Sequence, residues 1–497
     1  MLSRTVAASM AVMGLNGCVY GAVNDAATGS AIQGVTVTVA SGICTGTGCT
    51  TPAFQTTDEV GLFVFDAYGD RNGANQVQVI TPENGEEALR LRYTRAGYRS
   101  VNVYHRPRYE KATENGKDYL ISGVQTVYLC ALSAPDSDVD GICDAAEARY
   151  GTNALSSDTD GDSISDFAEL YGSGGVDLRS YGADPRKRDV FVELDYYPNL
   201  KPIQAALDRV TTAFASAPVS NPNGSTGVAL HLVVDQQIAA ADADMNLSPA
   251  FADFDVIKNK YFPARRAPFF HYGLIANQYD GGFSSGLSRG IPGHDFMVTL
   301  GNWSTPGGTE QQQAGTIMHE LGHNIGLQHG GNEGMNYKAN YLSVMSYMYQ
   351  LNGLRVDGTN GVVDYSRLRV AAVNEPFLNE LTAFAPFAPT TEADLARYGV
   401  RINGSLRTGT ASANLDFNGN GVIQAGVVAQ DLNNDGDTLD FIHSSQNDWT
   451  ELVYHGAGTI GDSHLGDAES LARAQPFLVM PDRTEPCITE QEHLKQP

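Results

Sequence analysis

Apolar and polar residues alternate along the first part of the chain, between turns that are rich in glycine. The alternation is regular in residues 35–39 and 76–80, and it is looser in residues 62–65. A period of two is the pattern of a strand with one buried face, and no helical spacing interrupts it. Residues 18–132 are therefore expected to form an all-β sandwich with antiparallel strands.

After residue 184 the pattern changes to apolar runs that alternate with a helical stretch. The expected strands are residues 189–195, 227–234, 269–275 and 294–300, and the expected helix is 202–217, with Pro202 in its first turn. Strands that alternate with a helix before a second, longer helix indicate an α/β layer. Residues 186–480 are thus predicted to form an α/β (α+β) domain.

The chain of 497 residues is long enough for several domains, about two to four at 100–200 residues each. An apolar fraction of 42% is sufficient for packed cores, which excludes a wholly disordered chain. We expect a multidomain protein with this order: a signal peptide at 1–17, the sandwich at 18–132, a spacer at 133–175, the α/β domain at 186–480 and a tail at 481–497.

The charge balance limits the partners. With 57 acidic and 32 basic residues the formal net charge is −25. Binding to phosphates requires clustered cationic side chains, so nucleic acid is excluded as a partner, and so is adhesion to an anionic membrane surface.

The first residues have a pattern that is typical of an export signal. Arg4 precedes an apolar run at 5–15 that is too short to span a membrane, and small residues lead to Cys18. Residues 15–18 resemble a bacterial lipobox, which implies a lipid on Cys18, although Asn16 is unusual there. The alternative is ordinary secretion with Cys18 as a structural thiol. The protein is expected to be secreted or a cell-envelope lipoprotein, with Cys18 as its sole route to a membrane.

The cysteines agree with an oxidising compartment. Two local disulfides are predicted, one between Cys44 and Cys49 and one between Cys130 and Cys143. If Cys18 carries a lipid, Cys487 is the odd cysteine; if it does not, the two can pair. Because no CxxC motif occurs, a cysteine zinc site is disfavoured.

Two acidic loops lie 22 residues apart in the same register, with carboxylates at loop positions 1, 3, 5, 9 and 12. Such spacing turns oxygens toward one centre, and calcium binds 6–8 oxygens. The other interpretation is an acidic solvated linker. The first set is Asp136, Asp138, Asp140, Asp144 and Glu147, and the second is Asp158, Asp160, Asp162, Asp166 and Glu169.

Two family resemblances follow for the first part of the chain. The paired acidic loops resemble thrombospondin type 3 repeats, which implies a spacer stiffened by structural Ca²⁺. The pattern of residues 21–25, 28–29, 34–35, 57–58 and 61–63 resembles the carboxypeptidase regulatory-like module. That module implies a binding or spacing role without chemistry of its own.

The strongest chemical signal is the string HExxHxxGxxH. His319 and His323 are one helical turn apart and can reach a single zinc ion, and Glu320 can approach a metal-bound water. A third ligand at His329 requires the chain to turn sharply, and Gly326 permits such a turn. The alternative of three structural core histidines is disfavoured because every specified position of the string is filled.

Met345 follows His329 by sixteen residues, within the sequence Ser-Val-Met-Ser-Tyr. Together with the histidine string, this sequence resembles the metzincin clan of zinc endopeptidases. Within the clan, the five residues around Met345 are most similar to those of the serralysin type. The resemblance implies one catalytic Zn²⁺ held by the three histidines, Met345 as the floor of the Met-turn, and Tyr347 as an auxiliary zinc ligand and oxyanion donor. The sequence contains no cysteine-switch motif of the matrix-metalloproteinase kind, so it predicts nothing about latency.

The remaining acidic stretch is ambiguous. Residues 416–420 and 431–437 again alternate Asp and Asn beside glycines, but neither set has a closing glutamate. Calcium and solvated Asx turns explain them equally.

The expected function is hydrolysis of internal peptide bonds in proteins or peptides by a zinc endopeptidase. Two alternatives remain: a non-catalytic surface adhesin on a metzincin-like scaffold, and a zinc-dependent terminal peptidase. Glu320 argues against the adhesin, since a degenerate scaffold has no need of a base beside intact ligands.

Overall fold

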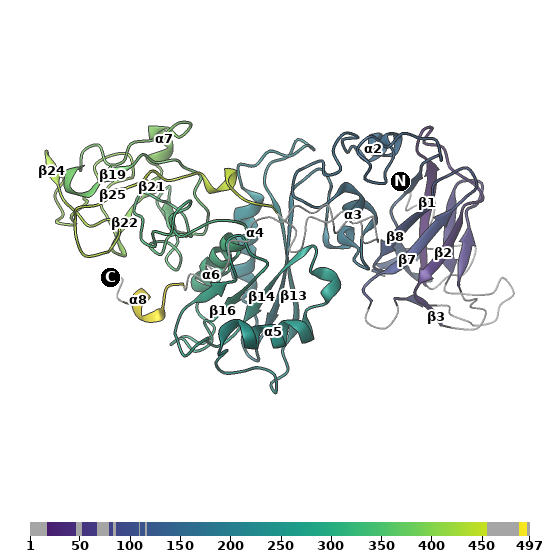
Figure 1. Ribbon diagram of the computed structural model, residues 1–497, viewed down its shortest axis with the longest axis horizontal. Coiled ribbons are helices and arrows are strands. Elements are labelled where there is room, and N and C mark those ends of the chain that lie inside the picture. The colour runs from purple at the N-terminus through teal and green to yellow at the C-terminus, as the bar shows by residue number, and fades with distance from the viewer. Residues whose placement is uncertain are drawn as a thin grey trace. The chain divides into compact units, whose positions relative to one another are not determined.

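The computed structural model describes residues 17–45, 52–66, 79–82, 86–108, 110–114, 117–454 and 487–494. The protein is a mixed α/β molecule with several sheets, one of them largely parallel and packed with helices (Figure 1). Its described residues fall into two compact units, one up to Lys187 and one from Arg188 onward. Within the described residues, no helix has the length and apolar character needed to cross a membrane. Residues 1–16 of the predicted signal peptide lie outside the described residues, and so does Cys49, the predicted disulfide partner of Cys44.

The first unit contains two larger sheets and a small one. One sheet has the order β11-β1-β10-β9, with β5 also paired to β1; the second has the order β4-β2-β7-β8; and β3 pairs with β6. The strands are β1 (Gly17–Asp25), β2 (Thr36–Ser41), β3 (Ile43–Thr45), β4 (Phe54–Thr56), β5 (Leu62–Asp66), β6 (Val79–Thr81), β7 (Leu89–Thr94), β8 (Val101–His105), β9 (Glu110–Glu114), β10 (Lys117–Gly123) and β11 (Val127–Leu129).

The expected purely antiparallel pairing is wrong at β1. This strand is antiparallel to β5 but parallel to β10 and β11, with Val23 opposite Val127. Alternation identifies the buried face of a strand but not its neighbours, and a chain that crosses over before returning produces parallel pairs. Residues of both larger sheets share one buried cluster, in which Phe63 and Tyr93 meet edge to face at 5.7 Å.

The segment predicted as a spacer packs onto that same core. It forms α2 (Asp144–Tyr150) and α3 (Asp166–Tyr171), followed by the 3-10 turn η1 (Leu178–Tyr181). Ala146 and Tyr171 belong to the buried cluster of the sheets. The disulfide Cys130–Cys143 ties the end of β11 to the start of α2 and confirms that pairing. The acidic loops are therefore part of the first unit.

The second unit is built on a five-stranded sheet in the order β13-β12-β14-β16-β15. Four strands are parallel, and the edge strand β15 is antiparallel to β16. The strands are β12 (Asp189–Tyr196), β13 (Ala229–Gln237), β14 (Phe270–Ile275), β15 (Gly286–Ser288) and β16 (Asp295–Val298). The four strands predicted from apolar runs are confirmed, because parallel strands covered on both faces are apolar along their whole length.

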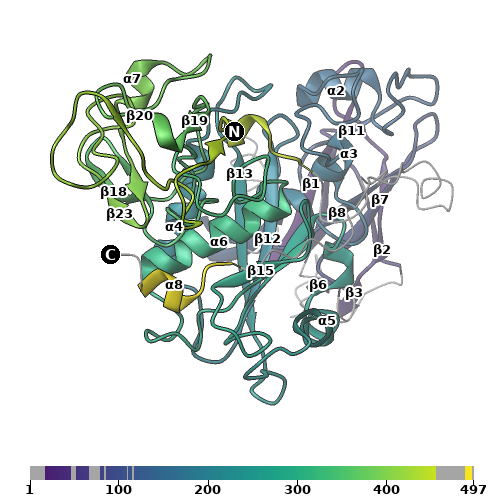
Figure 2. The same ribbon diagram turned by 60° about the vertical axis from the view of Figure 1, so that its left-hand side comes forward.

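Helices cover both faces of this sheet: α4 (Gln204–Ala215), α5 (Ala250–Tyr261) and α6 (Glu310–Asn324). Tyr272 packs against Phe254 of α5, whereas the adjacent His271 is hydrogen-bonded to Asn324 of α6. Neighbouring residues of a strand point to opposite faces, so α5 and α6 lie on opposite sides. Figure 2 shows α6 running across the strands.

The remaining elements of the second unit are short, and most surround a separate buried cluster after α6. They are η2 (Ala264–Arg266), β17 (Leu354–Val356), β18 (Thr359–Val362), β19 (Val373–Asn374), η3 (Glu375–Phe377), β20 (Leu378–Asn379), α7 (Glu392–Leu395), β21 (Tyr398–Gly399), β22 (Arg401–Ile402), β23 (Ser405–Leu406), β24 (Val427–Val428), β25 (Phe441–Ile442), η4 (Asp448–Thr450) and α8 (Glu490–Leu494).

Candidate metal centre

The central helix α6 begins with a capping box and is buried along most of its length. Oγ1 of Thr309 accepts the backbone N–H of Gln312, and the Gln312 side chain accepts the backbone N–H of Thr309. Each residue from Gln313 to Asn324 is buried. The helix can therefore hold polar side chains in a fixed place away from solvent.

Three histidine rings meet at the end of α6. Nε2 of His323 lies 3.1 Å from Nε2 of His319 and 3.1 Å from Nε2 of His329. All three side chains are buried, at no more than 1% exposure. Ligands placed 2.0–2.1 Å from a tetrahedral zinc are about 3.3 Å apart, so the spacing of these nitrogens fits such an ion.

Hydrogen bonds on the far side of each ring set the orientation of the imidazoles. Nδ1 of His319 donates to the carbonyl oxygen of Val344 at 2.9 Å, and Nδ1 of His323 donates to that of Leu327 at 2.7 Å. Nδ1 of His329 donates to Oδ1 of Asn336 at 2.8 Å. Since a carbonyl oxygen accepts only, the proton is on Nδ1, and each Nε2 presents a lone pair to the common point.

Three converging lone pairs without a proton between them repel one another unless a cation lies at their centre. Burial lowers the pKa of His323 to about 3 and that of His319 well below its ordinary value, and the neighbouring imidazoles act in the same direction. The rings of His319 and His323 are therefore neutral at neutral pH, as metal ligands must be. This donor set fits zinc.

The turn that brings back the third histidine depends on Gly326. Its φ is 98°, in the left-handed region where a side chain is strained, and a Cβ atom there would come within 2.9 Å of the Val453 side chain. The predicted role of this glycine is confirmed.

Glu320 lies beside the histidines and is fully buried. No hydrogen bond of normal geometry reaches either of its carboxylate oxygens from the described residues. Burial raises the pKa of Glu320 to about 8, and the neighbouring Cys487 side chain acts in the opposite direction. A Cβ atom at Gly286 of β15 would come within 2.3 Å of its Oε1, so the carboxylate lies directly against the edge strand.

The segment of the predicted Met-turn lies next to these residues. Met345 is fully buried, and a Cβ atom at Gly322 would come within 2.3 Å of its Sδ, so the thioether packs against the helix turn between His319 and His323. The ring of Tyr347 lies 4.5 Å from that of His329 between centroids. The backbone N–H of Tyr347 donates to the carbonyl oxygen of Asn336 at 2.9 Å, so Asn336 contacts both residues.

Two residues of the centre were not found from the sequence. Asn336 carries no motif signal, because its contact with His329 depends on the path of the loop. Cys487 was expected to be odd or paired with Cys18, yet its Sγ and one nitrogen of each histidine all lie within 4.8 Å of one another. The lack of a CxxC motif therefore does not exclude a cysteine from this group of ligand atoms.

The two acidic loops of the first unit bring carboxylates together. The side chains of residues 136, 138 and 140 form one group and those of 158, 160 and 162 form another, each with oxygens within 4.8 Å. Oδ2 of Asp138, Oδ2 of Asp140 and Oε2 of Glu147 are buried and have no hydrogen-bond partner among the residues that the structure describes. Burial, followed by neighbouring acidic groups, raises the pKa of Glu147 to about 8; burial is also the first cause of the raised pKa of Asp140, about 7.

The carboxylates at loop position 9 accept hydrogen bonds within their own loops. Asp144 accepts the N–H and the hydroxyl of Ser137, each at 2.8 Å. Asp166 accepts the N–H and the hydroxyl of Thr159 at 2.9 and 2.6 Å. Asp144 and Asp166 therefore each hold their own loop together by hydrogen bonds. The other carboxylates of the two loops lie at positions 1, 3, 5 and 12, and Glu169 is the one at position 12 of the second loop.

The later acidic stretches form turns. Asp416 accepts the backbone N–H groups of Asn420 and Gly421, and Asp431 accepts those of Asn434 and Gly436. Side-chain oxygens bound to backbone N–H groups a few residues ahead are typical of Asx-type turns, and Asp158 of the second acidic loop binds the N–H groups of Gly161 and Ser163 in the same way.

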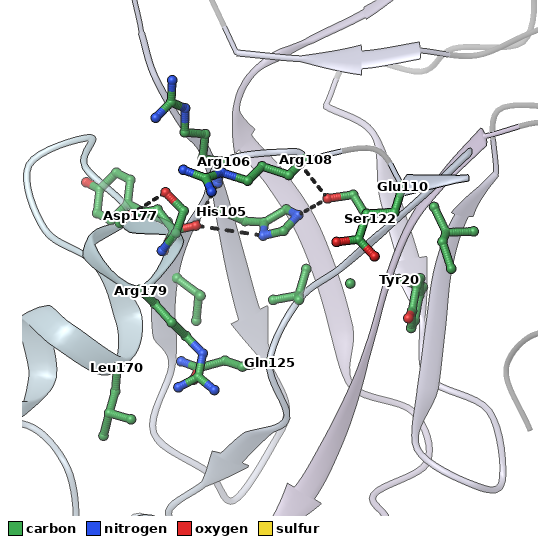
Figure 3. A pocket seen from close by; sticks show the side chains of 16 residues that line it. Tyr20, His105, Arg106, Arg108, Glu110, Ser122, Gln125, Leu170, Asp177 and Arg179 are labelled. Atoms are coloured by element: carbon green, nitrogen blue, oxygen red, sulfur yellow. Dashed lines mark hydrogen bonds and ion pairs between the residues drawn. The ribbon is translucent and has the colours of Figure 1, made fainter. Parts of the chain in front are cut away.

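A polar pocket of about 340 Å³ in the first unit is a further candidate (Figure 3). Nε2 of His105 lies 2.9 Å from Oγ of Ser122, and its Nδ1 lies 4.0 Å from Oδ2 of Asp177. The second distance is too long for a hydrogen bond, and that Oδ2 already accepts the N–H of Arg106 at 2.9 Å. Burial lowers the pKa of His105 to about 4. We assign no chemistry to this network.

No protein family and no curated protein matches the chain. Similar solved structures include hydroxyquinol 1,2-dioxygenase from Pseudomonas putida DLL-E4, with 12% identity, a TM-score of 0.15, and 23% of this chain and 56% of that chain covered. For 3-chlorocatechol 1,2-dioxygenase from Rhodococcus opacus 1CP the identity is 14% and the TM-score 0.16, with 24% of this chain and 61% of that chain covered. For the group B streptococcus pilus 2b backbone protein the identity is 15% and the TM-score 0.14, with 24% of this chain and 42% of that chain covered. The chain thus spans less than two thirds of each, and similarity at this level does not identify a family.

Proposed function

We propose that this protein is an exported zinc endopeptidase of the metzincin type. The observation that carries the proposal is the convergence of three imidazole rings, with Nε2 of His323 3.1 Å from that of each of the other two, beside a buried carboxylate that no hydrogen bond of normal geometry reaches from the described residues. A cation satisfies the imidazoles, and a proton taken from water satisfies the carboxylate.

A bound zinc would polarise both a water molecule and the scissile carbonyl. Glu320 then accepts the proton of the attacking water and returns it to the leaving amine, and its raised pKa suits this exchange. Tyr347, whose ring lies against His329, would donate a hydrogen bond to the developing oxyanion. The antiparallel edge strand β15 can add an extended peptide as a further strand.

The test is cleavage of denatured casein with and without a chelator. Because the Cys487 sulfur lies near the histidines, wild type and Cys487→Ala are assayed in parallel, each with its zinc content measured. Cleavage by either protein that stops on chelation and returns with zinc supports the proposal. Casein left intact by both zinc-loaded proteins would contradict it.

Three variants assign the roles within this assay. Glu320→Gln should keep its zinc and lose activity about 10²–10⁴-fold, because the ligands remain and the base is removed. Tyr347→Phe should keep its zinc and lose about 10²-fold in kcat. His323→Ala should lose the metal itself. Near-normal activity in Glu320→Gln would exclude it as the base and favour another role for the site.

For the first unit we propose a carboxypeptidase regulatory-like sandwich that carries two structural calcium sites. The buried oxygens of Asp138, Asp140 and Glu147 support the cation, since like charges left buried are otherwise costly. The disulfide Cys130–Cys143 agrees with an extracytoplasmic location.

A further inference from the structure

The segment around Cys487, far from the histidines in sequence, is folded against the candidate metal centre. The Cys487 side chain is 3% exposed, and its Sγ belongs to the same group of ligand atoms as His319, His323 and His329. Figures 1 and 2 agree in placing α8, which follows this cysteine, beside α6.

The backbone of the segment is held as an added strand. The N–H of Ser285 donates to the carbonyl oxygen of Ile488 at 3.0 Å, and the N–H of Glu490 donates to that of Phe283 at 3.1 Å. Ser284 and Thr489 form an antiparallel bridge, and Oγ of Ser284 donates to the carbonyl oxygen of Cys487 at 2.8 Å. This pairing lies directly before β15, the edge to which a peptide substrate would add.

Contacts after the cysteine anchor the segment at its other end. Oε1 of Glu490 accepts the N–H of Ser304 at 2.7 Å. The ring of His493 stacks on Trp303, with 6.4 Å between centroids. Thr489 and Glu492 cap the short helix through hydrogen bonds of 2.8 Å. Contacts at Cys487 itself and at the residues that follow it therefore hold this segment against the second unit.

Three histidines leave one tetrahedral position at a zinc ion, which is open to water in a catalytic site and closed by a protein ligand in a structural one. We propose that Cys487 is the fourth zinc ligand and that residues 487–494 block the substrate edge, so that the chain is latent as folded. The proposal rests on the zinc site of the proposed function. On binding, the thiol releases its proton to solvent; when the segment leaves, water takes the position and the thiolate is protonated again.

Cobalt substitution tests the ligand independently of activity. Full-length wild type, Cys487→Ala and the matched control Cys18→Ala are loaded with one Co²⁺ per chain, and near-ultraviolet thiolate-to-cobalt charge transfer is recorded. We expect the band in wild type and in Cys18→Ala, and its loss in Cys487→Ala with the cobalt still bound. Bound cobalt without the band in wild type would overturn the proposal.

Alkylation of the thiol gives a second readout. Iodoacetamide should modify Cys487 at least tenfold more slowly in the zinc-loaded protein than after chelation, as measured by peptide mass spectrometry. Equal rates would overturn the proposal. A Cys18–Cys487 disulfide, seen as one linked peptide without reduction, would also overturn it.

Activity separates this inference from the proposed function. We expect Cys487→Ala to cleave casein at least tenfold faster than wild type, and Cys18→Ala to equal wild type. Equal cleavage by all three proteins, with no cobalt band, overturns latency and leaves the peptidase intact. A cobalt band that depends on Cys487, without cleavage by any of the three, supports the ligand and overturns the peptidase.

Discussion

Asn336 is the one side chain among the three Nδ1 acceptors, because Val344 and Leu327 accept through backbone carbonyls. It holds His329, the one histidine of the three that does not lie on α6, and it is exposed, so replacing it does not disturb a core. The precision of the third ligand therefore depends on a residue that no motif includes.

Asn336→Ala should weaken zinc binding about tenfold, at the lower end of the range for loss of a ligand's hydrogen-bond partner, because water can reach the vacated position. The measurement is a competition titration against a chromophoric chelator. Asn420→Ala, another exposed asparagine of the second unit, serves as the control and should bind zinc as wild type does. An unchanged affinity in Asn336→Ala would mean that packing alone orients His329.

The residues of the site divide into those that local spacing predicts and those that it cannot. His319, Glu320 and His323 follow from the periodicity of one helix, and His329 from the turn at Gly326. Met345 and Tyr347 were expected only through resemblance. Asn336 and Cys487 reach the centre by the path of loops and by strand pairing, which leave no periodic signal.

Among the elements, the acidic loops are the ones whose stability we expect to depend most on calcium. Removing calcium should lower the thermal midpoint and expose residues 136–169 to proteases, since the buried carboxylates then repel one another. A ligand present at 100 times its dissociation constant contributes about 2.7 kcal/mol. Limited proteolysis and calorimetry with and without EGTA provide the measurement.

Glu147→Gln is the matched variant for this prediction. It should be less stable than wild type in calcium, because one ligand charge is lost, and more stable than wild type in EGTA, because one repelling charge is removed. Equal protection of wild type in both buffers would contradict the calcium sites.

A second element, the segment that carries Met345, is tied to η4 by Asp448. This carboxylate accepts the hydroxyls of Tyr341 and Ser343 and the N–H of Ser366, all within 2.8 Å. Burial raises its pKa to about 6 from the ordinary 3.8, against the opposing effect of these hydrogen bonds.

The folded protein thus binds this proton more tightly than the unfolded chain does. Between about pH 4 and pH 6 the contribution of Asp448 to the unfolding free energy should fall as pH rises, by at most about 1.4 kcal/mol per pH unit, and it should be constant above. Denaturant titrations of wild type and Asp448→Asn across this range should show their difference in stability decreasing with pH. A difference that increases with pH would contradict the assignment.

The elements that the sequence predicted well are those with long, regular patterns. The apolar run of β12 is buried in seven of its eight residues, and α4 begins two residues after Pro202. By contrast, β15 and the two-residue strands after α6 are too short to show a period. The parallel neighbours of β1 were missed because alternation carries no information about pairing.

At the scale of the whole molecule, every residue assigned to the zinc site belongs to the second unit, which also contains its own sheet and buried cluster. Residues 188–497 expressed alone should therefore bind one zinc per chain, as measured by atomic emission after gel filtration. Aggregation of the fragment, or a soluble fragment without zinc, would show that the site depends on the first unit.

The position of β1 also has a consequence for the order of events during synthesis. The residues of β1 pair with β5, but also with β10 and β11. The sheet around Val23 is therefore complete only after Val127 has been synthesised and has paired with it. Contacts between residues so distant in sequence form slowly, because a long loop must close first. A chain that leaves the ribosome with its first strand unmatched therefore stays open until about a hundred further residues have been made.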